Sequence, residues 1–372
     1  MVYLDNAATS FPKPKSVIKE VIRCLSDYCG NPGRSSFGIS LTASERIYEA
    51  RERVSELLFF DDPTRIIFTQ NATHGLNIAI KGLINEPCHV IISDLEHNSV
   101  LRPLYKTLHS LGGEISVFDS DKNIVDAVLP LLRDDTKVII STLASNVTGK
   151  IVDYKALSKL SRKKGIKLIL DASQLLGHKV FHYNDCPADC IVAPGHKGLF
   201  GLQGSGILLI GKDARPDTLT EGGNGYDTLN TGMADLLPER YEAGTLATPA
   251  IVGLSEGIRY IQEIGLPIIE EKIDMLTMIA YDILHSFRDI DVYGGETGII
   301  SFNFRDAHSS SIAEALSLEG IMTRSGLHCS PLIHKKLGTL DKGAVRISLS
   351  YFNDKKDLDR LFRALKNLDR IK

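Results

Sequence analysis

A series of short apolar runs, separated by segments of helical length, most constrains the fold of this 372-residue chain. Three or four consecutive apolar residues between polar segments are typical of strands buried on both faces. Strands that alternate with helices predict an α/β fold with a mostly parallel, doubly wound sheet. The runs lie at residues 66–69, 90–92, 115–117, 138–140, 168–170, 190–192 and 207–210.

The pattern changes after Gly265. A long helix to about Phe287 is followed by short strands at 291–293 and 298–304, a helix at 311–318 and a strand at 344–349. This order predicts a smaller α+β domain. We therefore expect a large domain over residues 15–257 and a small domain over 258–372, with residues 1–14 packing near the small domain.

Composition and charge exclude several classes of function. The formal net charge of −3 provides no basic surface for nucleic acid and no polybasic patch for a membrane. The first residues lack a charged-then-apolar signal sequence, and no apolar run approaches the length of a membrane span. The six cysteines include no CxxC pair, so we expect reduced thiols, no metal site and a cytoplasmic location.

One lysine follows the apolar run 190–192 in the short segment APGHKG, residues 193–198. A lysine after a strand is usually only a solvated loop residue. Three other strand-like runs also end in polar residues, however, and the carboxyl ends of parallel strands meet at one edge of a sheet. A lysine amine at that edge can form a Schiff base with the aldehyde of pyridoxal phosphate (PLP). We therefore predict that Lys197 holds this cofactor.

Two of those runs end in ionisable residues that suit such a cofactor. Asp171 directly follows residues 168–170, where a carboxylate is costly unless it is paired. It either caps a helix or binds a protonated pyridine nitrogen, which keeps the ring electron-withdrawing. His97 follows the run 90–92 and is either a structural histidine or an imidazole that stacks on a flat ring.

The third run, 66–69, leads through the turn 70–75 into a helix. The free N–H groups and the positive end of the helix dipole make this turn a potential phosphate site. Asn71 or Thr73 could also serve simply as the helix cap, and capping is compatible with phosphate binding.

The order of Lys197, Asp171 and Cys329, together with His97 and Asn146, resembles the class V aminotransferase family of PLP enzymes. Within that family the chain is most similar to cysteine desulfurases and selenocysteine lyases, nearer the SufS-like branch than the NifS/IscS-like one. The resemblance covers essentially the whole chain, from YLDNAA at 3–8 to VRIS at 345–348. It implies the PLP-dependent transferase fold of type I and a homodimer with shared active sites.

The resemblance also implies a role for individual residues. Lys197 would hold the cofactor, Asp171 would bind its ring nitrogen, and Cys329 would be the catalytic nucleophile. His97 would stack over the ring and move protons at the substrate thiol. Ala72, Thr73 and His196 would contact the cofactor phosphate, and Thr245 would reach the phosphate in the neighbouring subunit. Gln174 and Asn146 would lie around the ring hydroxyl and the substrate. The substrate carboxylate would be bound by Arg346 and Arg34.

Some positions depart from the family pattern. Pro194 replaces a serine and Ala72 replaces a threonine, so two hydroxyls that would bind phosphate are absent. Leu327 replaces a polar residue that often precedes His-Cys in the SufS-like branch. The loop 31–34 and the segment 223–241 also differ, and both border the expected site and subunit interface.

By this resemblance the protein would remove sulfur from L-cysteine, leaving L-alanine and a persulfide on Cys329. The sulfur would pass to an acceptor protein for iron–sulfur clusters or other sulfur metabolism. The alternatives are a selenocysteine lyase acting on L-selenocysteine, another class V activity, and a non-catalytic scaffold. Cys329 lies beside His328 in a loop bounded by Gly326 and Pro331, which favours a desulfurase. We expect an imidazolium at His328 to favour the thiolate of Cys329.

Overall fold

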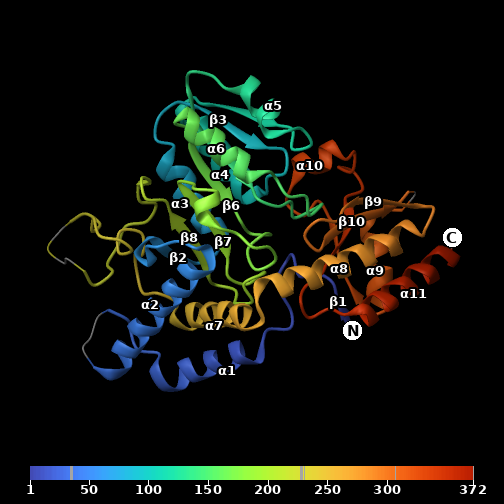
Figure 1. Ribbon diagram of the computed structural model, residues 1–372, viewed down its shortest axis with the longest axis horizontal. Coiled ribbons are helices and arrows are strands. Elements are labelled where there is room, and N and C mark those ends of the chain that lie inside the picture. Colours follow the sequence, from blue (N-terminus) through green and yellow to red (C-terminus); the bar gives the residue numbers. More distant parts are fainter. Residues whose placement is uncertain (34–36, 227–228, 230, 306, 372) are drawn as a thin grey trace.

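The computed structural model describes residues 1–33, 37–226, 229, 231–305 and 307–371. Its centre is a seven-stranded sheet with the strand order β2-β8-β7-β6-β5-β3-β4 (Figure 1). Only β8 is antiparallel to its neighbours in this sheet, which confirms the prediction of a mostly parallel α/β fold. The strands are β2 (Ile66–Thr69), β3 (His89–Ser93), β4 (Glu114–Phe118), β5 (Thr136–Thr142), β6 (Lys167–Asp171), β7 (Cys190–Pro194) and β8 (Gly206–Ile210).

Helices cover both faces of this sheet because each central strand contains consecutive apolar residues that are buried. In β5, Ile139 belongs to the core cluster that includes residues of α2, α6 and α7, whereas Val138 and Ile140 belong to the cluster with residues of α3 and α4 on the opposite face. Successive side chains of a strand point to opposite faces, so a continuous apolar run requires cover on both. The helices of this part are α1 (Lys15–Arg23), α2 (Gly38–Leu58), α3 (Ala72–Leu83), α4 (Asn98–Leu111), α5 (Ile124–Val128), α6 (Tyr154–Lys164) and α7 (Thr248–Ile264).

Local signals in the sequence account for several helix ends. The side chain of Asp153 accepts a hydrogen bond from the Ala156 N–H at 3.0 Å, and Gly165 ends α6 with a φ of 65°. An aspartate N-cap and a glycine after the last turn are common signals for the two ends of a helix. Asn71 caps α3 by accepting a hydrogen bond from the His74 N–H at 2.9 Å.

A four-stranded antiparallel sheet with the order β12-β13-β10-β9 forms the second part of the molecule. Helix α8 (Leu266–His285) runs from the end of α7 to this sheet (Figure 1). The predicted domain boundary at 257/258 falls within α7, and the division itself stays a prediction. The remaining elements are β9 (Ile290–Gly294), β10 (Ile299–Phe304), α9 (Ser309–Leu318), β12 (Arg324–Gly326), α10 (Pro331–Lys336), β13 (Ala344–Ser348) and α11 (Lys355–Ile371).

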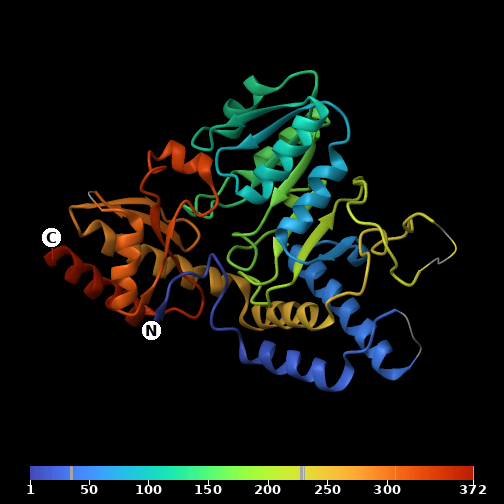
Figure 2. The same cartoon turned by 180° about the vertical axis from the view of Figure 1, so that it is seen from behind.

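The first residues of the chain lie beside this smaller sheet and then run towards α1 (Figure 2). Strand β1 (Val2–Tyr3) pairs in parallel with β11 (Ile321–Met322). The Ala7 N–H donates to the Ser348 hydroxyl at 2.8 Å, while Lys13 Nζ donates to the carbonyl of His196 at 2.9 Å. The N-terminal segment therefore bonds both to the small sheet and to the loop of the large sheet that carries Lys197.

Candidate active site

A cavity of about 180 Å³ lies at the carboxyl ends of β5, β6 and β7. Residues from strands far apart in the sequence meet here, as expected for a parallel sheet. The lining includes eight residues to which the family resemblance assigns a role: Ala72, Thr73, His97, Asn146, Asp171, Gln174, His196 and Lys197. Cys329, Arg346 and Thr245 are not part of this lining, and Arg34 lies outside the described residues.

Lys197 lies in a tight turn that directly follows β7. The turn closes on itself, because the Gly201 N–H donates to Gly195 O at 2.8 Å and the Phe200 N–H donates to Lys197 O at 3.0 Å. A Cβ on Gly177 would lie 2.1 Å from Gly198 O, so only glycine permits this approach of the two loops. Burial lowers the pKa of Lys197 to about 8, opposed by the nearby Asp171 carboxylate.

Asp171 is the last residue of β6 and is buried. Its Oδ1 accepts the Ser173 N–H at 2.9 Å, which orders the turn after the strand. No α-helix begins between residues 172 and 182, so the alternative interpretation of Asp171 as a helix cap is wrong. Its carboxylate lines the cavity together with Lys197.

His97 caps α4 and also forms part of the cavity wall. Its Nδ1 accepts the Ser99 N–H at 3.1 Å, so the proton of the neutral ring resides on Nε2. Burial lowers the pKa of His97 to about 4. The ring is therefore neutral near pH 7 and presents Nε2–H as a donor.

The N-terminus of α3 forms the opposite wall with Ala72 and Thr73. The first N–H groups of a helix lack partners within the helix and form an anion site. Thr73 Oγ1 lies 2.8 Å from Ser99 Oγ, so Ser99 adds a hydroxyl close to this turn. Sequence reasoning missed Ser99, although its place in the first turn after His97 was a usable signal.

Cys329 lies in a turn at residues 327–330, which confirms the predicted loop, and its side chain is exposed although His328 and Ser330 beside it are buried. His328 and Cys329 adopt positive φ values of 47° and 60°, which are uncommon for residues other than glycine. Cys329 O accepts the Asn98 N–H at 2.7 Å, and this bond joins the turn to the start of α4 beside His97. Within the described residues the other exposed thiol is that of Cys29.

The side-chain amide of Asn146 forms two hydrogen bonds with the same turn. Its Nδ2 donates to His328 O at 2.7 Å, and its Oδ1 accepts the Ser330 hydroxyl at 2.7 Å. Both ends of this amide are therefore engaged by the turn, although Asn146 also lines the cavity. The residue links the Lys197 cavity to the turn that carries Cys329.

The prediction of an imidazolium at His328 is wrong. The ring is buried, its Nε2 donates to Ala344 O at 3.0 Å, and burial lowers the pKa of His328 to about 2. A neutral ring near pH 7 supplies no positive charge to Cys329. Local sequence could not reveal this, because strand β13 provides both the burial and the hydrogen bond.

Arg346 projects from β13 and is only 1% exposed. Its Nη1 donates to Asn146 O at 3.0 Å, and its Nη2 forms an ion pair with Asp5 Oδ1 at 2.7 Å. Arg324 of β12 pairs with Arg346 in the strand register. Sequence reasoning assigned no role to Asp5 or Arg324, because neither contact follows from a local pattern.

Comparison with known proteins identifies the family. Residues 2–361 match the family described as Aminotransferase class-V. The chain belongs to this family. A probable cysteine desulfurase of Methanothermobacter thermautotrophicus is 29% identical over 380 residues, which is 99% of this chain and 94% of the relative. A probable cysteine desulfurase of Halalkalibacterium halodurans is 27% identical over 379 residues, covering 98% of this chain and 92% of the relative.

Solved structures of similar proteins have the same fold as this chain. The apo structure of cysteine desulfurase from Thermococcus onnurineus NA1 has a TM-score of 0.89 at 28% identity and covers 99% of this chain and 94% of its own. The cysteine desulfurase CsdA from Escherichia coli has a TM-score of 0.88 at 24% identity, covers 99% of this chain and 94% of its own, and supports the fold alone. The predicted fold of type I is confirmed.

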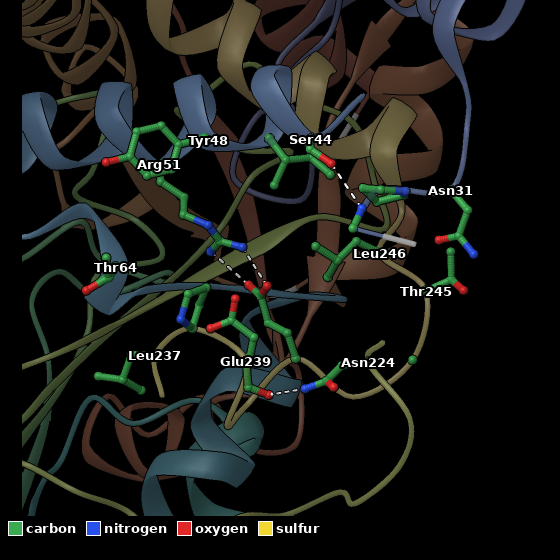
Figure 3. Close-up of a pocket in the computed structure, with 16 residues that line it drawn as sticks. Asn31, Ser44, Tyr48, Arg51, Thr64, Asn224, Leu237, Glu239, Thr245 and Leu246 are labelled. Carbon is green, nitrogen blue, oxygen red and sulfur yellow. Dashed lines mark hydrogen bonds and ion pairs between the residues drawn. The ribbon is translucent and has the colours of Figure 1, made fainter. Parts of the chain in front are cut away.

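Thr245 of the class V protein lies at a second cavity of about 370 Å³. Figure 3 shows Thr245 and Leu246 beside Asn31, with Arg51 on another wall. Arg51 and Glu242 form a buried ion pair at 2.5 Å in this wall. Thr245 is exposed and does not line the Lys197 cavity of its own chain, so its implied contact with a partner subunit stays a prediction.

No helix among the described residues is both long and apolar enough to cross a membrane. Over the same residues, no group of three or more His, Cys, Asp or Glu side chains could hold a metal ion.

Proposed function

We propose that this protein is a PLP-dependent cysteine desulfurase, which converts L-cysteine to L-alanine and carries the sulfur as a persulfide on Cys329. The observation that carries the proposal is the hydrogen bond from the Asn98 N–H to Cys329 O at 2.7 Å. It fixes an exposed thiol-bearing turn next to His97, which lines the cavity of Lys197. The names of the relatives, cysteine desulfurase or probable cysteine desulfurase, support the same activity.

The residues around Lys197 fit PLP. Two buried polar atoms of the lining, His196 Nδ1 and Gln174 Oε1, have no hydrogen-bond partner among the described residues. Unpaired buried polar groups are costly, and a polar ligand relieves that cost. Asp171 would hold the ring nitrogen, the N-terminus of α3 would hold the phosphate, and Lys197 would hold the aldehyde carbon. Bound PLP supplies an electron sink for charge that develops on the substrate Cα.

The chain's own residues account for the remaining chemistry. Arg346 would bind the substrate carboxylate with its planar guanidinium. Lys197, whose pKa burial lowers to about 8, can accept the Cα proton near neutral pH. His97, which is neutral and protonated on Nε2, can exchange a proton with the substrate thiol.

Sulfur transfer itself occurs at Cys329. Its thiolate attacks the substrate sulfur, so that a new S–S bond forms and the substrate Cβ–S bond breaks. The electron pair of the broken bond stays with the substrate carbon, which gains a proton and leaves as L-alanine. The exposure of the Cys329 turn then lets an acceptor thiol reach the persulfide.

The family resemblance further leads us to propose a cytoplasmic homodimer with shared sites. In it, Thr245 of one subunit would bind the phosphate in the other subunit, and Arg34 would contribute to substrate binding. The exposure of Thr245 and its absence from the lining of the Lys197 cavity in its own chain support this arrangement.

Parallel assays test the proposal. Alanine formation is measured with L-cysteine and with L-selenocysteine, and alkylated peptides are analysed by mass spectrometry for a persulfide. We expect Cys329→Ala to abolish desulfuration of cysteine, while the matched control Cys29→Ala retains both activity and the persulfide on Cys329. Full activity of Cys329→Ala with cysteine would refute the persulfide mechanism, and activity with selenocysteine alone would favour a selenocysteine lyase.

The cofactor assignment has its own test. Borohydride reduction of the yellow protein should fix the cofactor to the peptide that contains Lys197, and Lys197→Ala should prevent this labelling. A label on any other lysine would contradict the assignment.

A further inference from the structure

Arg346 is paired with a carboxylate from the far end of the chain. Asp5 Oδ1 lies 2.7 Å from Arg346 Nη2. The backbone of Asp5 forms a parallel β-bridge with Ser348, and the neighbouring Ala7 N–H donates to the Ser348 hydroxyl. The Asp5 carboxylate is therefore held against Arg346 by the strand that carries the arginine.

The N–H donors of the Arg346 guanidinium differ in whether they already have a partner. Nη1 donates to Asn146 O at 3.0 Å, and Nη2 donates to Asp5. Nε is buried and has no partner among the described residues. One edge of the guanidinium, formed by Nε and Nη2, thus combines an unpaired donor with a donor bonded to Asp5. A carboxylate that binds this edge with both oxygens must take Nη2 from Asp5.

The charges of Asp5 and Arg346 also affect the pKa of Lys197. The charge of Asp5 raises the pKa of Lys197, whereas the charge of Arg346 lowers it. The two charges therefore lie close enough to the amine to offset each other there. Asp5 keeps Arg346 neutralised until another anion replaces it.

We propose that Asp5 occupies the carboxylate-binding edge of Arg346 in the resting protein and that the substrate carboxylate displaces it from Nη2. This inference rests on the proposed function, because it takes Arg346 as the substrate-carboxylate site. Asp5 lowers the affinity of the site for every carboxylate. Simple anions therefore bind weakly, and a ligand binds well only when its other groups, such as the thiol or the amine, add further contacts.

The test measures binding without turnover. The ligand is 3-mercaptopropionate, which has the carboxylate and thiol of cysteine but no amine, and its Kd is measured calorimetrically on the holoenzyme. Asp5→Asn preserves the shape of the side chain and removes its charge. We expect this variant to bind the ligand roughly tenfold or more tightly than the unchanged protein, because a charge-assisted hydrogen bond no longer competes. The KM for cysteine should fall with it, with little change in kcat.

Asp274→Asn serves as the matched control. Asp274 is a surface aspartate that pairs with Lys179 at 2.7 Å, and its loss should leave the Kd unchanged. A crystal structure of the unchanged protein with 3-mercaptopropionate tests the displacement without any variant, should Asp5→Asn fail to fold. We expect the ligand carboxylate on Nε and Nη2, with Asp5 moved away from Nη2.

Two results would overturn the inference while leaving the proposed function intact. One is equal or weaker binding by Asp5→Asn in a protein that still desulfurates cysteine. The other is a ligand complex in which Asp5 keeps its bond to Nη2. Failure of the proposed function looks different, because the unchanged protein would then neither desulfurate cysteine nor bind the ligand at Arg346, and the inference would fall with it.

Discussion

The amide of Asn146 provides a quantitative test of how the Cys329 turn is held. Asn146→Ala removes the donor to His328 O and the acceptor of the Ser330 hydroxyl, each bonded at 2.7 Å. The methyl group of alanine replaces neither bond. The backbone of residue 146 still accepts the Arg346 Nη1, so the change is confined to the turn.

The expected magnitude follows from the two groups left without a partner. A buried polar group that loses its partner costs about 1–3 kcal/mol. Water can reach part of this exposed turn, so we expect a total of about 2–4 kcal/mol for the two groups. This corresponds to a roughly 30- to 700-fold rise in the population of the open turn.

Hydrogen exchange measures that population directly. The Asn98 N–H, which donates to Cys329 O, and the N–H groups of 327–330 should exchange faster by the same factor in Asn146→Ala. Persulfide formation on Cys329 should slow in parallel, because the thiol is no longer fixed beside His97.

Asn353→Ala is the matched control for a buried asparagine. Asn353 is 5% exposed and bonds Tyr3 O and the Ser350 N–H, away from the Cys329 turn. Its replacement should speed exchange at 1–6 and 350–357 but not at 327–330. Unchanged exchange at Asn98 and 327–330 in Asn146→Ala would refute the assignment of Asn146 as the support of the turn.

Three further predictions concern charged groups. Asp171→Asn should keep the fold but reduce alanine formation at least ~10-fold, because an amide supports a protonated ring nitrogen poorly; near-normal turnover would limit Asp171 to ordering its turn. In the cofactor-free protein, the pKa of Lys197 is lowered to about 8, so the unfolded chain binds more protons above that pH. Thermal melts should therefore show stability rising between pH 8 and the pKa of an unfolded lysine by about 3 kcal/mol relative to Lys197→Met, and no difference in slope would contradict this. Lys336 Nζ lies 2.6–2.7 Å from carboxylate oxygens of Asp94, Asp119 and Asp121. Lys336→Gln should therefore speed hydrogen exchange in α10, and ~1 M salt should do the same in the unchanged protein by screening these ion pairs. Exchange that does not respond to salt would contradict a role of these ion pairs in holding α10.

The strands and the residues of the Lys197 cavity could be predicted from the sequence because they depend on short sequence patterns. Each central strand has a run of three or more apolar residues, and polar residues stand at its carboxyl end or soon after it, as Asp171 and Lys197 do. The parallel sheet then brings those strand ends to one edge. The proposed contacts with the cofactor ring and phosphate rest on that one topological fact.

Contacts between distant segments could not be predicted in this way. Asp5 and Arg346 are 341 positions apart, and no local pattern connects them. The three residues of β12 include Gly326 and no apolar residue, so they carry no strand signal. The protonation of His328 depends on burial by β13, which local sequence does not encode.

The pairing of β1 with β11 determines when the active site can be completed during synthesis. Residues 2–3 leave the ribosome long before residues 321–322, which are their partners. At roughly 5–20 residues per second, the first strand waits about 15–65 s for the second. Until then, the N-terminal segment lacks its partners in the small sheet, and the bonds from Ser10 and Lys13 to the carbonyl of His196 have to form without that support. The N-terminal segment, which supports the loop of Lys197, is thus secured to the small sheet only near the end of synthesis, although it was made first.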